Sequence, residues 1–88
     1  MMDLTDKVVL ITGGTGSFGR QFTQTVLSRF KVKKLIIFSR DELKQSEMYR
    51  QFPEKNIRYF IGDVRDLDRL RRTMRGVDIV VHAAVAAL

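Results

Sequence analysis

Apolar positions follow two different periods along the chain, and these periods predict strands that alternate with helices. Short apolar runs, rich in β-branched residues, cover residues 7–12, 33–39, 57–61 and 77–84. All four runs predict strands, and the first, residues 7–12, is typical of a strand that is buried on both faces of a parallel sheet. Between them, apolar residues recur every three or four positions, which predicts helices with one apolar stripe facing the sheet.

Each of the three expected helices has sequence signals at its ends. The first follows a glycine-rich loop, while the second begins near Ser39 and Glu42, which have capping-box spacing, and is stopped by Pro53. In the third, Asp66 can cap the start and Gly76 can end the helix. The side chains expected to face the sheet are Phe18, Phe22, Val26 and Phe30 with Leu27 in the first helix, and Leu67, Leu70 and Met74 in the third.

The order of the expected elements decides the fold class. A strand, a helix and a second strand form a βαβ unit, whose crossover is right-handed and whose strands are parallel. We therefore predict an α/β fold, namely a partial Rossmann fold whose parallel sheet has about four strands in the order 3-2-1-4, with three helices. The switch point of this sheet lies between the first and fourth strands, at the glycine-rich loop.

The stretch ITGGTGSFGR, residues 11–20, contains the first candidate binding residues. It holds four of the chain's six glycines and joins an expected strand to an expected helix. That position is typical of a pyrophosphate-binding loop, because glycine allows a tight turn and a close backbone approach, and the helix N-terminus favours an anion. A plain turn is the alternative, but it needs fewer glycines. The candidate contacts are Gly13, Thr15, Gly16, Ser17, Phe18 and Gly19.

Residues after the second strand favour NADP over NAD. An NAD site usually has an acid at this point, which accepts a hydrogen bond from the ribose 2′-hydroxyl. This chain has Ser39, Arg40 and Lys44, a hydroxyl and two cations that suit a 2′-phosphate. Asp41 and Glu42 follow directly, so NAD remains the alternative cofactor. These acids either accept hydrogen bonds from a ribose or stabilise the first turn of the next helix by their negative charge.

The third and fourth strands end in further candidates. Asp63 can accept a hydrogen bond from the exocyclic amine of an adenine whose face Val64 covers; alternatively, Asp63 caps the third helix, alone or with Asp66. Small residues at 83–84 leave room for a dinucleotide near the backbone. His82 has no second metal ligand at a useful spacing, so we predict a packed or hydrogen-bonded histidine and no metal site.

The composition of the chain bears on its location in the cell and on whether it binds membranes or nucleic acid. The 88 residues contain no cysteine and no apolar run of membrane-spanning length, and no signal peptide precedes the first strand, so a cytoplasmic protein without membrane association is expected. The net charge of +6 raises nucleic acid as a partner. However, many basic residues alternate with acids, as in residues 63–75, and no aromatic residues interleave with them, so nucleic-acid binding is not favoured.

Four blocks of sequence carry a resemblance to a known family. With TGGTGSFG, FSRDELKQSEM, YFIGDVRD and VDIVVHAA, the chain resembles the N-terminal part of the inverting UDP-N-acetylglucosamine 4,6-dehydratases. These enzymes belong to the extended short-chain dehydrogenase/reductase group and act in bacterial surface-polysaccharide and flagellin-glycan synthesis. The resemblance runs from about residue 3 to residue 84, and the block at residues 39–48 is its most specific part.

The resemblance implies a cofactor, a substrate and a set of contacts. In the family, NADP takes a hydride from C4 of the UDP-sugar, water leaves across C5 and C6, and the hydride returns to C6 with inversion at C5. Assembly of the chain into a homo-oligomer is compatible with the resemblance and is neither predicted nor excluded. By position, the family's contacts would be residues 15–18 for the pyrophosphate, 39–44 for the 2′-phosphate, Asp63 and Val64 for the adenine, and Ala84 for the nicotinamide-side ribose.

The chain also departs from the family's pattern. Residues 85–88 read VAAL, where the family has a lysine that contacts the cofactor. Four residues after Tyr49 and Tyr59 stand Pro53 and Asp63, so the Tyr-x-x-x-Lys pair of the family is absent and no catalytic residue is expected. We therefore expect residues 1–88 to be a truncated N-terminal NAD(P)-binding Rossmann segment, inactive alone. A stand-alone dinucleotide-binding module, or part of another sugar-nucleotide epimerase or reductase, is the alternative.

Overall fold

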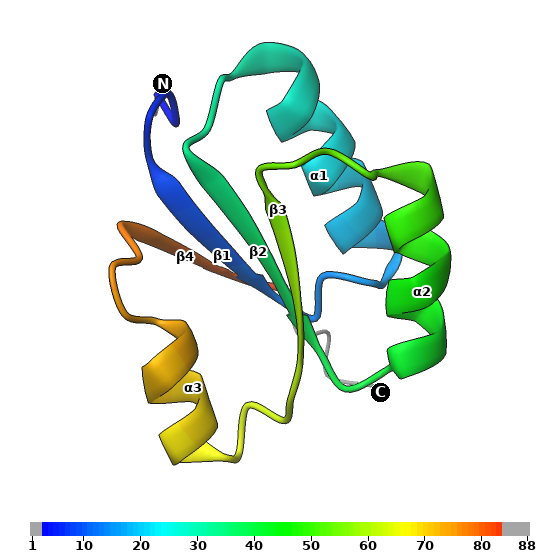
Figure 1. Ribbon diagram of the computed structural model, residues 1–88, viewed down its shortest axis with the longest axis vertical. Coiled ribbons are helices and arrows are strands. Elements are labelled where there is room, and N and C mark those ends of the chain that lie inside the picture. The colour runs from blue at the N-terminus through cyan, green and yellow to red at the C-terminus, as the bar shows by residue number, and fades with distance from the viewer. Residues whose placement is uncertain (1–2, 84–88) are drawn as a thin grey trace.

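Four parallel strands form the centre of the molecule in a computed structural model that describes residues 3–83 (Figure 1). The strand order is β3-β2-β1-β4, so the predicted topology is confirmed. Within the described residues, none of the helices has the length and apolarity needed to cross a bilayer. The elements are β1 (Val8–Thr12), α1 (Ser17–Arg29), β2 (Lys34–Ser39), α2 (Glu42–Gln51), β3 (Ile57–Ile61), α3 (Leu67–Thr73) and β4 (Ile79–His82).

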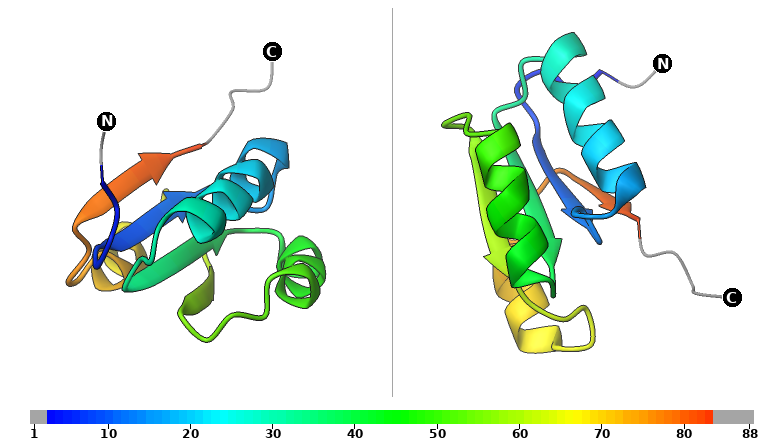
Figure 2. Two further views of the ribbon diagram at one scale, coloured as in Figure 1. Left: turned by 90° about the horizontal axis from the view of Figure 1, so that it is seen from above. Right: turned by 90° about the vertical axis from the view of Figure 1, so that its right-hand side faces the viewer.

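The two faces of the sheet are covered unequally. Helices α1 and α2 pack on one face and α3 on the other (Figure 2). Successive residues of a strand point to opposite faces, so Val9 and Ile11 of β1 join the core under α1 and α2, while Val8 and Leu10 join the core under α3. Among residues 3–83, the first core contains ten buried residues and the second four. The side of α1 and α2 therefore supplies most of the apolar stabilisation.

Strand burial falls from the centre of the sheet to its edges. All five residues of β1 are buried, and so are five of the six in β2. In contrast, Phe60 of β3 and Val80 of β4 are 36% and 44% exposed. The expectation that the first strand is buried on both faces is thus confirmed. Phe60 and Val80 stay exposed because α3, with seven residues, is too short to cover its whole face.

The apolar stripe expected on α1 is only partly buried. Val26 is buried, but Phe18 is 53% exposed and stacks on Phe22 with ring centroids 6.0 Å apart. The helix instead buries Gly19 and Thr23. Gly19 is required there because the start of α1 packs directly against Gly14 of the glycine-rich loop, where a larger side chain has no space.

Helix α3 likewise faces the sheet with other residues than expected. Thr73 is buried and Leu70 packs against the smaller core, whereas Leu67 is 59% and Met74 39% exposed. Asp66 caps α3 as predicted, since its carboxylate accepts from the backbone N–H of Arg69 at 3.2 Å. The expected apolar stripe is thus confirmed at Leu70 and wrong at Leu67 and Met74, of which Met74 lies beyond the end of the helix at Thr73.

The start of α2 corrects the expected capping box. Asp41 is the N-cap residue, and its carboxylate accepts from the backbone N–H of Lys44 at 2.9 Å. Ser39 does not cap the helix, because it is the last residue of β2 and is buried there. Its hydroxyl is therefore free of the capping role and lies at the edge of the sheet.

Candidate functional site

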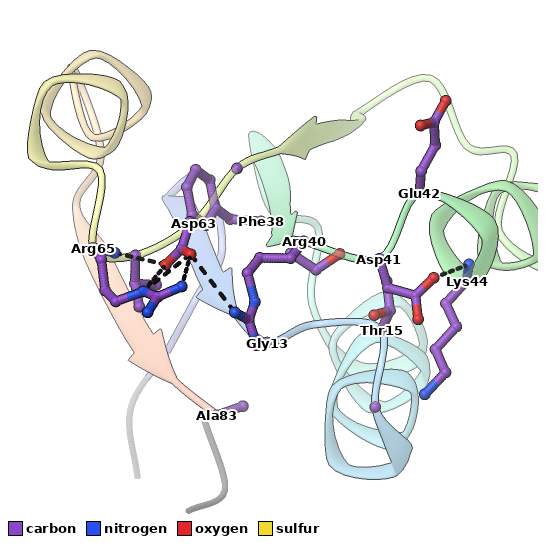
Figure 3. A pocket seen from close by; sticks show the side chains of 14 residues that line it. Gly13, Thr15, Phe38, Arg40, Asp41, Glu42, Lys44, Asp63, Arg65 and Ala83 are labelled. Carbon is purple, nitrogen blue, oxygen red and sulfur yellow. Dashed lines mark hydrogen bonds and ion pairs between the residues drawn. The ribbon is translucent and has the colours of Figure 1, made fainter.

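An open groove of about 1130 Å³ lies at the carboxyl ends of β1, β2 and β3 (Figure 3). In parallel α/β sheets this edge, near the switch point, is where ligands bind. The groove brings together most of the predicted site residues: Gly13, Thr15, Gly16, Ser39, Arg40, Asp41, Glu42, Lys44, Asp63 and Val64. Three residues that we did not predict also line it, namely Phe38, Gly62 and Arg65, as does Ala83, one of the small residues expected to leave room for a dinucleotide.

The other predicted residues lie elsewhere. Ser17, Phe18 and Gly19 are in the first turn of α1 but do not line the groove, so contacts between their backbone N–H groups and a pyrophosphate stay predictions. Ala84 lies outside the described residues. Its neighbour Ala83 lines the groove, and the backbone N–H of Ala83 donates to the carbonyl of Thr12 at 3.0 Å.

The glycine-rich loop makes a tight turn from β1 into α1. Gly13 has a φ of 66°, in the left-handed region that favours glycine. Its N–H donates to the carbonyl of Phe38 at 2.9 Å, which fixes the loop to the end of β2. A Cβ atom on Gly19 would lie 2.1 Å from the carbonyl oxygen of Gly14. The turn therefore needs glycine for two reasons, a left-handed backbone and a close contact between loop and helix.

The first turn of α1 has no acceptor of its own. Gly16 is its N-cap residue and offers no side-chain cap, and the first turn contains no acidic residue. A Cβ on Gly16 would meet nothing nearer than the carbonyl oxygen of Gly13, at 3.7 Å. The helix dipole and the unpaired N–H groups of a first turn favour an anion at this place. At this wall the groove thus has a helix N-terminus without an acidic side chain and with room for a Cβ atom.

Cationic side chains from three parts of the chain line the groove. Arg40 extends across the groove toward β3, where its guanidinium lies 3.6 Å from the carboxylate of Asp63 (Figure 3). Arg65 forms a closer pair with the same carboxylate, at 2.7 Å. Lys44 lies at the other end of the groove, on the first turn of α2.

Asp63 is held by a dense set of donors. The Arg65 side chain donates to both carboxylate oxygens, and the Arg65 backbone N–H donates to one of them at 2.9 Å. These hydrogen bonds, with the positive charges of Arg65 and Arg40, hold the pKa of Asp63 well below its ordinary value of 3.8. Asp66, and not Asp63, caps α3, which removes one of the two expected roles of Asp63. Arg65 could have been noticed in the motif GDVRD, two residues after the aspartate.

Two other side chains with candidate chemistry have structural partners. His82 Nδ1 lies 2.5 Å from the hydroxyl of Thr12, in agreement with the hydrogen-bonded histidine that we predicted. The hydroxyl of Tyr59 donates to the carbonyl of Phe52 at 2.9 Å, and burial raises its pKa to about 12. A tyrosine with a raised pKa is poorly suited to act as a general base. In residues 3–83, no group of three or more acidic or histidine side chains is placed to hold a metal ion.

Residues 9–87 match the family model described as polysaccharide biosynthesis protein. The chain belongs to this family. It is 59% identical over 78 residues to a UDP-N-acetylglucosamine 4,6-dehydratase (inverting) from Campylobacter jejuni, which confirms the resemblance seen in the sequence. It is also 46% identical over 86 residues to a UDP-glucose 4-epimerase from Rickettsia akari. These matches cover 89% and 90% of this chain but 23% and 24% of the relatives, so the chain spans about a quarter of their length.

Solved structures agree with this family and fold. The protein Pen from Bacillus thuringiensis is 42% identical with a TM-score of 0.90, over 99% of this chain and 28% of that one. DesIV, a dTDP-glucose 4,6-dehydratase from Streptomyces venezuelae solved with NAD and TYD bound, is 26% identical with a TM-score of 0.76, over 92% of this chain and 27% of that one. The described part of this chain therefore has the Rossmann-type fold of these solved structures.

Proposed function

We propose that this chain forms the NADP-binding part of a sugar-nucleotide 4,6-dehydratase that acts on UDP-N-acetylglucosamine. The observation that carries the proposal is the groove at the switch-point edge, where an uncapped helix N-terminus faces the cations that follow β2. The 59% identity to the Campylobacter jejuni dehydratase supports the same activity.

The loop end of the groove fits a pyrophosphate. Gly16 leaves open space where a larger residue would project a side chain, and the first turn of α1 carries no carboxylate that would repel an anion. The Thr15 side chain lines the same wall and can donate to a phosphate oxygen. This end would hold the pyrophosphate by backbone N–H groups, in the way common to dinucleotide-binding loops.

The β2 end fits a 2′-phosphate better than a free ribose hydroxyl. Arg40 and Lys44 are exposed cations that line the groove beside Ser39. A phosphate would compete with Asp63 for the Arg40 guanidinium, which is already held at 3.6 Å and so directed into the groove. Asp41 accepts from the backbone N–H of Lys44, so its carboxylate orients the helix start.

Asp63 and Val64 form the adenine end of the proposed site. Both line the groove, and the carboxylate of Asp63 is ionised and fixed in place by Arg65. When bound, the cofactor would accept the hydride from C4 of the sugar and return it to C6. The described residues bind and orient; the 88-residue sequence has no Tyr-x-x-x-Lys pair, so this chain alone supplies no acid–base pair and is expected to be inactive.

A sugar-nucleotide epimerase is the second candidate. It is supported by the 46% identity to the Rickettsia akari UDP-glucose 4-epimerase over 90% of this chain. Both candidates need a dinucleotide in the same groove, so they differ in the substrate and in the fate of the hydride. Either enzyme would work in the cytoplasm, where nucleotide sugars and dinucleotides are available, and the absence of cysteine fits a reducing compartment.

Calorimetric titration of the protein with NADP and NAD tests the proposal. We expect NADP to bind at least about tenfold more tightly, because charge-assisted hydrogen bonds to the 2′-phosphate add to those that both dinucleotides make. Arg40→Met and Lys44→Met should each weaken NADP binding and leave NAD binding almost unchanged. The matched control is Arg50→Met, which removes an exposed arginine from the last turn of α2, away from the groove. Equal affinities for NADP and NAD would refute the NADP assignment.

Activity provides an independent check. We expect the 88-residue chain to form no product when it is incubated with UDP-N-acetylglucosamine and NADP. Mass spectrometry of the sugar nucleotide should detect no species that has lost one molecule of water. Formation of a 4-keto-6-deoxy sugar would show that other residues replace the Tyr-x-x-x-Lys pair and would contradict the expected inactivity.

A further inference from the structure

Gln45 is a buried polar residue of α2 that the proposed site does not yet use. Its side chain is 4% exposed and lies behind the groove, not in its lining. The amide nitrogen Nε2 donates to the Phe60 carbonyl at 2.7 Å and to the Ser39 hydroxyl at 2.9 Å. A longer contact of 3.3 Å reaches the Ser39 carbonyl. One amide thus connects α2 to the carboxyl ends of both β2 and β3.

The partners of Gln45 determine which way its amide is turned. Two of the three are backbone carbonyls, and a carbonyl oxygen only accepts hydrogen bonds. The NH₂ group, not the amide oxygen, must therefore face them. Burial makes the opposite orientation costly, because two oxygens would then meet without a proton between them.

This orientation decides the role of the Ser39 hydroxyl. An NH₂ group only donates, so the oxygen of Ser39 accepts from Gln45 and its own proton must point elsewhere. Ser39 lines the groove, and among the described residues its hydroxyl has no other hydrogen-bond partner. The proton is therefore available to a ligand in the groove.

We propose that Gln45 is a positioning residue that makes Ser39 a hydrogen-bond donor toward the groove and so favours a 2′-phosphate over a 2′-hydroxyl. This inference rests on the proposed function, because it concerns the selectivity of the same site. The oxygens of a phosphate only accept, and a hydrogen bond to an ionised group is about twice as strong as a neutral one. A ribose hydroxyl gains only the weaker, neutral bond from the same donor.

The register of the sheet strengthens this argument. Ser39 pairs with Ile61 across β2 and β3, and the backbone N–H of Gly62 donates to the Ser39 carbonyl at 2.9 Å. Gln45 adds the Phe60 carbonyl to this network, so the hydroxyl of Ser39 is held relative to both strands. The donor is thus fixed before any ligand arrives, which reduces the ordering cost of binding.

Gln45→Met tests the proposal, since methionine keeps the length of the side chain and removes the amide donor. We expect the Kd for NADP to rise about fivefold to tenfold and the Kd for NAD to change by less than about twofold. A residue that only held α2 in place would alter both affinities together. The matched control is Gln51→Met, at the exposed last position of the same helix, which should alter neither affinity.

A second variant, Ser39→Ala, tests the same proposal if Gln45→Met unfolds the protein. It should weaken NADP binding by the same factor as Gln45→Met and spare NAD, and the double variant should bind NADP no more weakly than Ser39→Ala alone. An unchanged preference for NADP in Ser39→Ala would overturn the inference, as would equal losses of NADP and NAD in a folded Gln45→Met variant.

These outcomes are separable from failure of the proposed function. If the unsubstituted protein binds neither NADP nor NAD, the proposed function is refuted, and the role of Gln45 with it. If the unsubstituted protein prefers NADP and the variants keep that preference, only the role of Gln45 is refuted.

Discussion

The N-terminal ends of α1 and α2 lie at the same edge of the sheet, but the chain completes them in opposite ways. At α2, Asp41 accepts from the N–H of Lys44, and Glu42 adds a second negative charge to the first turn. At α1, Gly16 offers no side-chain acceptor, and the first turn has no acid. The positive end of the α2 dipole is thus balanced by side chains of its own first turn, whereas the first turn of α1 has no such balance; the proposed function places the pyrophosphate there.

The two ends differ in their N-cap residue and in how they pack. Helix α1 has Gly16 as its N-cap, without a side chain, and packs against its own loop at Gly19, where a Cβ would collide with Gly14. Helix α2 starts after a buried strand end and has space for a capping carboxylate. Its other end is completed as well, because the Tyr59 hydroxyl donates to the carbonyl of Phe52. On the proposed function, the uncapped start of α1 faces the ligand, whereas the capped start of α2 serves the fold.

The largest effect is expected from Gly19→Ala, which tests whether close packing dictates the start of α1. The new Cβ would lie 2.1 Å from the Gly14 carbonyl oxygen, so loop and helix must separate. We expect the free energy of unfolding, measured in urea, to fall by about 3 kcal/mol, the upper part of the usual range for overpacking. Gly16→Ala is the control, since its Cβ has space, and it should change stability little. Similar stabilities for the two variants would contradict this account.

Gly16→Asp gives α1 the type of cap that α2 has, and so exchanges the two roles. The carboxylate can accept from the first-turn N–H groups, so stability should not fall, but it occupies the anion site with a like charge. We expect NADP to bind about a hundredfold more weakly, close to 2.7 kcal/mol. Gly16→Ser, a neutral cap, should cause a smaller loss of affinity in the same calorimetric titration. Unchanged NADP binding by Gly16→Asp would show that α1 does not face the cofactor.

Asp41→Ala removes the N-cap side chain of α2. It should lower the free energy of unfolding, because the backbone N–H of Lys44 loses its acceptor. The expected loss is about 1 kcal/mol in the free energy of unfolding. Asp41→Asn separates the cap from the charge, since asparagine accepts the same hydrogen bond without the negative charge. Urea unfolding of both variants decides between them: if Asp41→Asn is as unstable as Asp41→Ala, charge and not capping stabilises α2.

The smallest effect concerns the far end of α2 and depends on pH. Burial raises the pKa of Tyr59 from 10.0 to about 12, so the folded state favours the neutral phenol. Its contribution to stability is complete below pH 10 and is lost as pH rises through 12. Tyr59→Phe should lower the free energy of unfolding by less than about 1 kcal/mol at neutral pH, through the lost hydrogen bond to Phe52.

The alkaline part of this prediction has its own measurement. The difference in stability between the unsubstituted protein and Tyr59→Phe should shrink between pH 10 and pH 12. A difference that stays constant over this range would mean that the hydroxyl of Tyr59 does not titrate with the assigned pKa.

Sequence patterns predicted the element order, the strand order and most of the groove lining, because these depend on local signals. The glycine spacing around Gly13, the residues after β2 and the cap at Asp66 are all local, and the structure places them as expected. The misplaced cap illustrates the limit of such signals, since the spacing of Ser39 and Glu42 imitated a capping box while Asp41 performed the role. Two nearby candidates for one hydrogen bond are not separated by spacing alone.

Only the tertiary structure decided which groups meet across the chain. Three sets of contacts join residues that are placed by the fold. They are the hydrogen bonds between Arg65 and Asp63, the ion pair between Arg40 and Asp63, and the hydrogen bonds of the Gln45 amide to the ends of β2 and β3. The exposure of Phe18 is of the same kind, because the burial of an apolar residue depends on what packs against it. The sequence by itself thus determined where a ligand groove forms, whereas three-dimensional packing decided which side chains point into it and which hydrogen bonds they have left to offer.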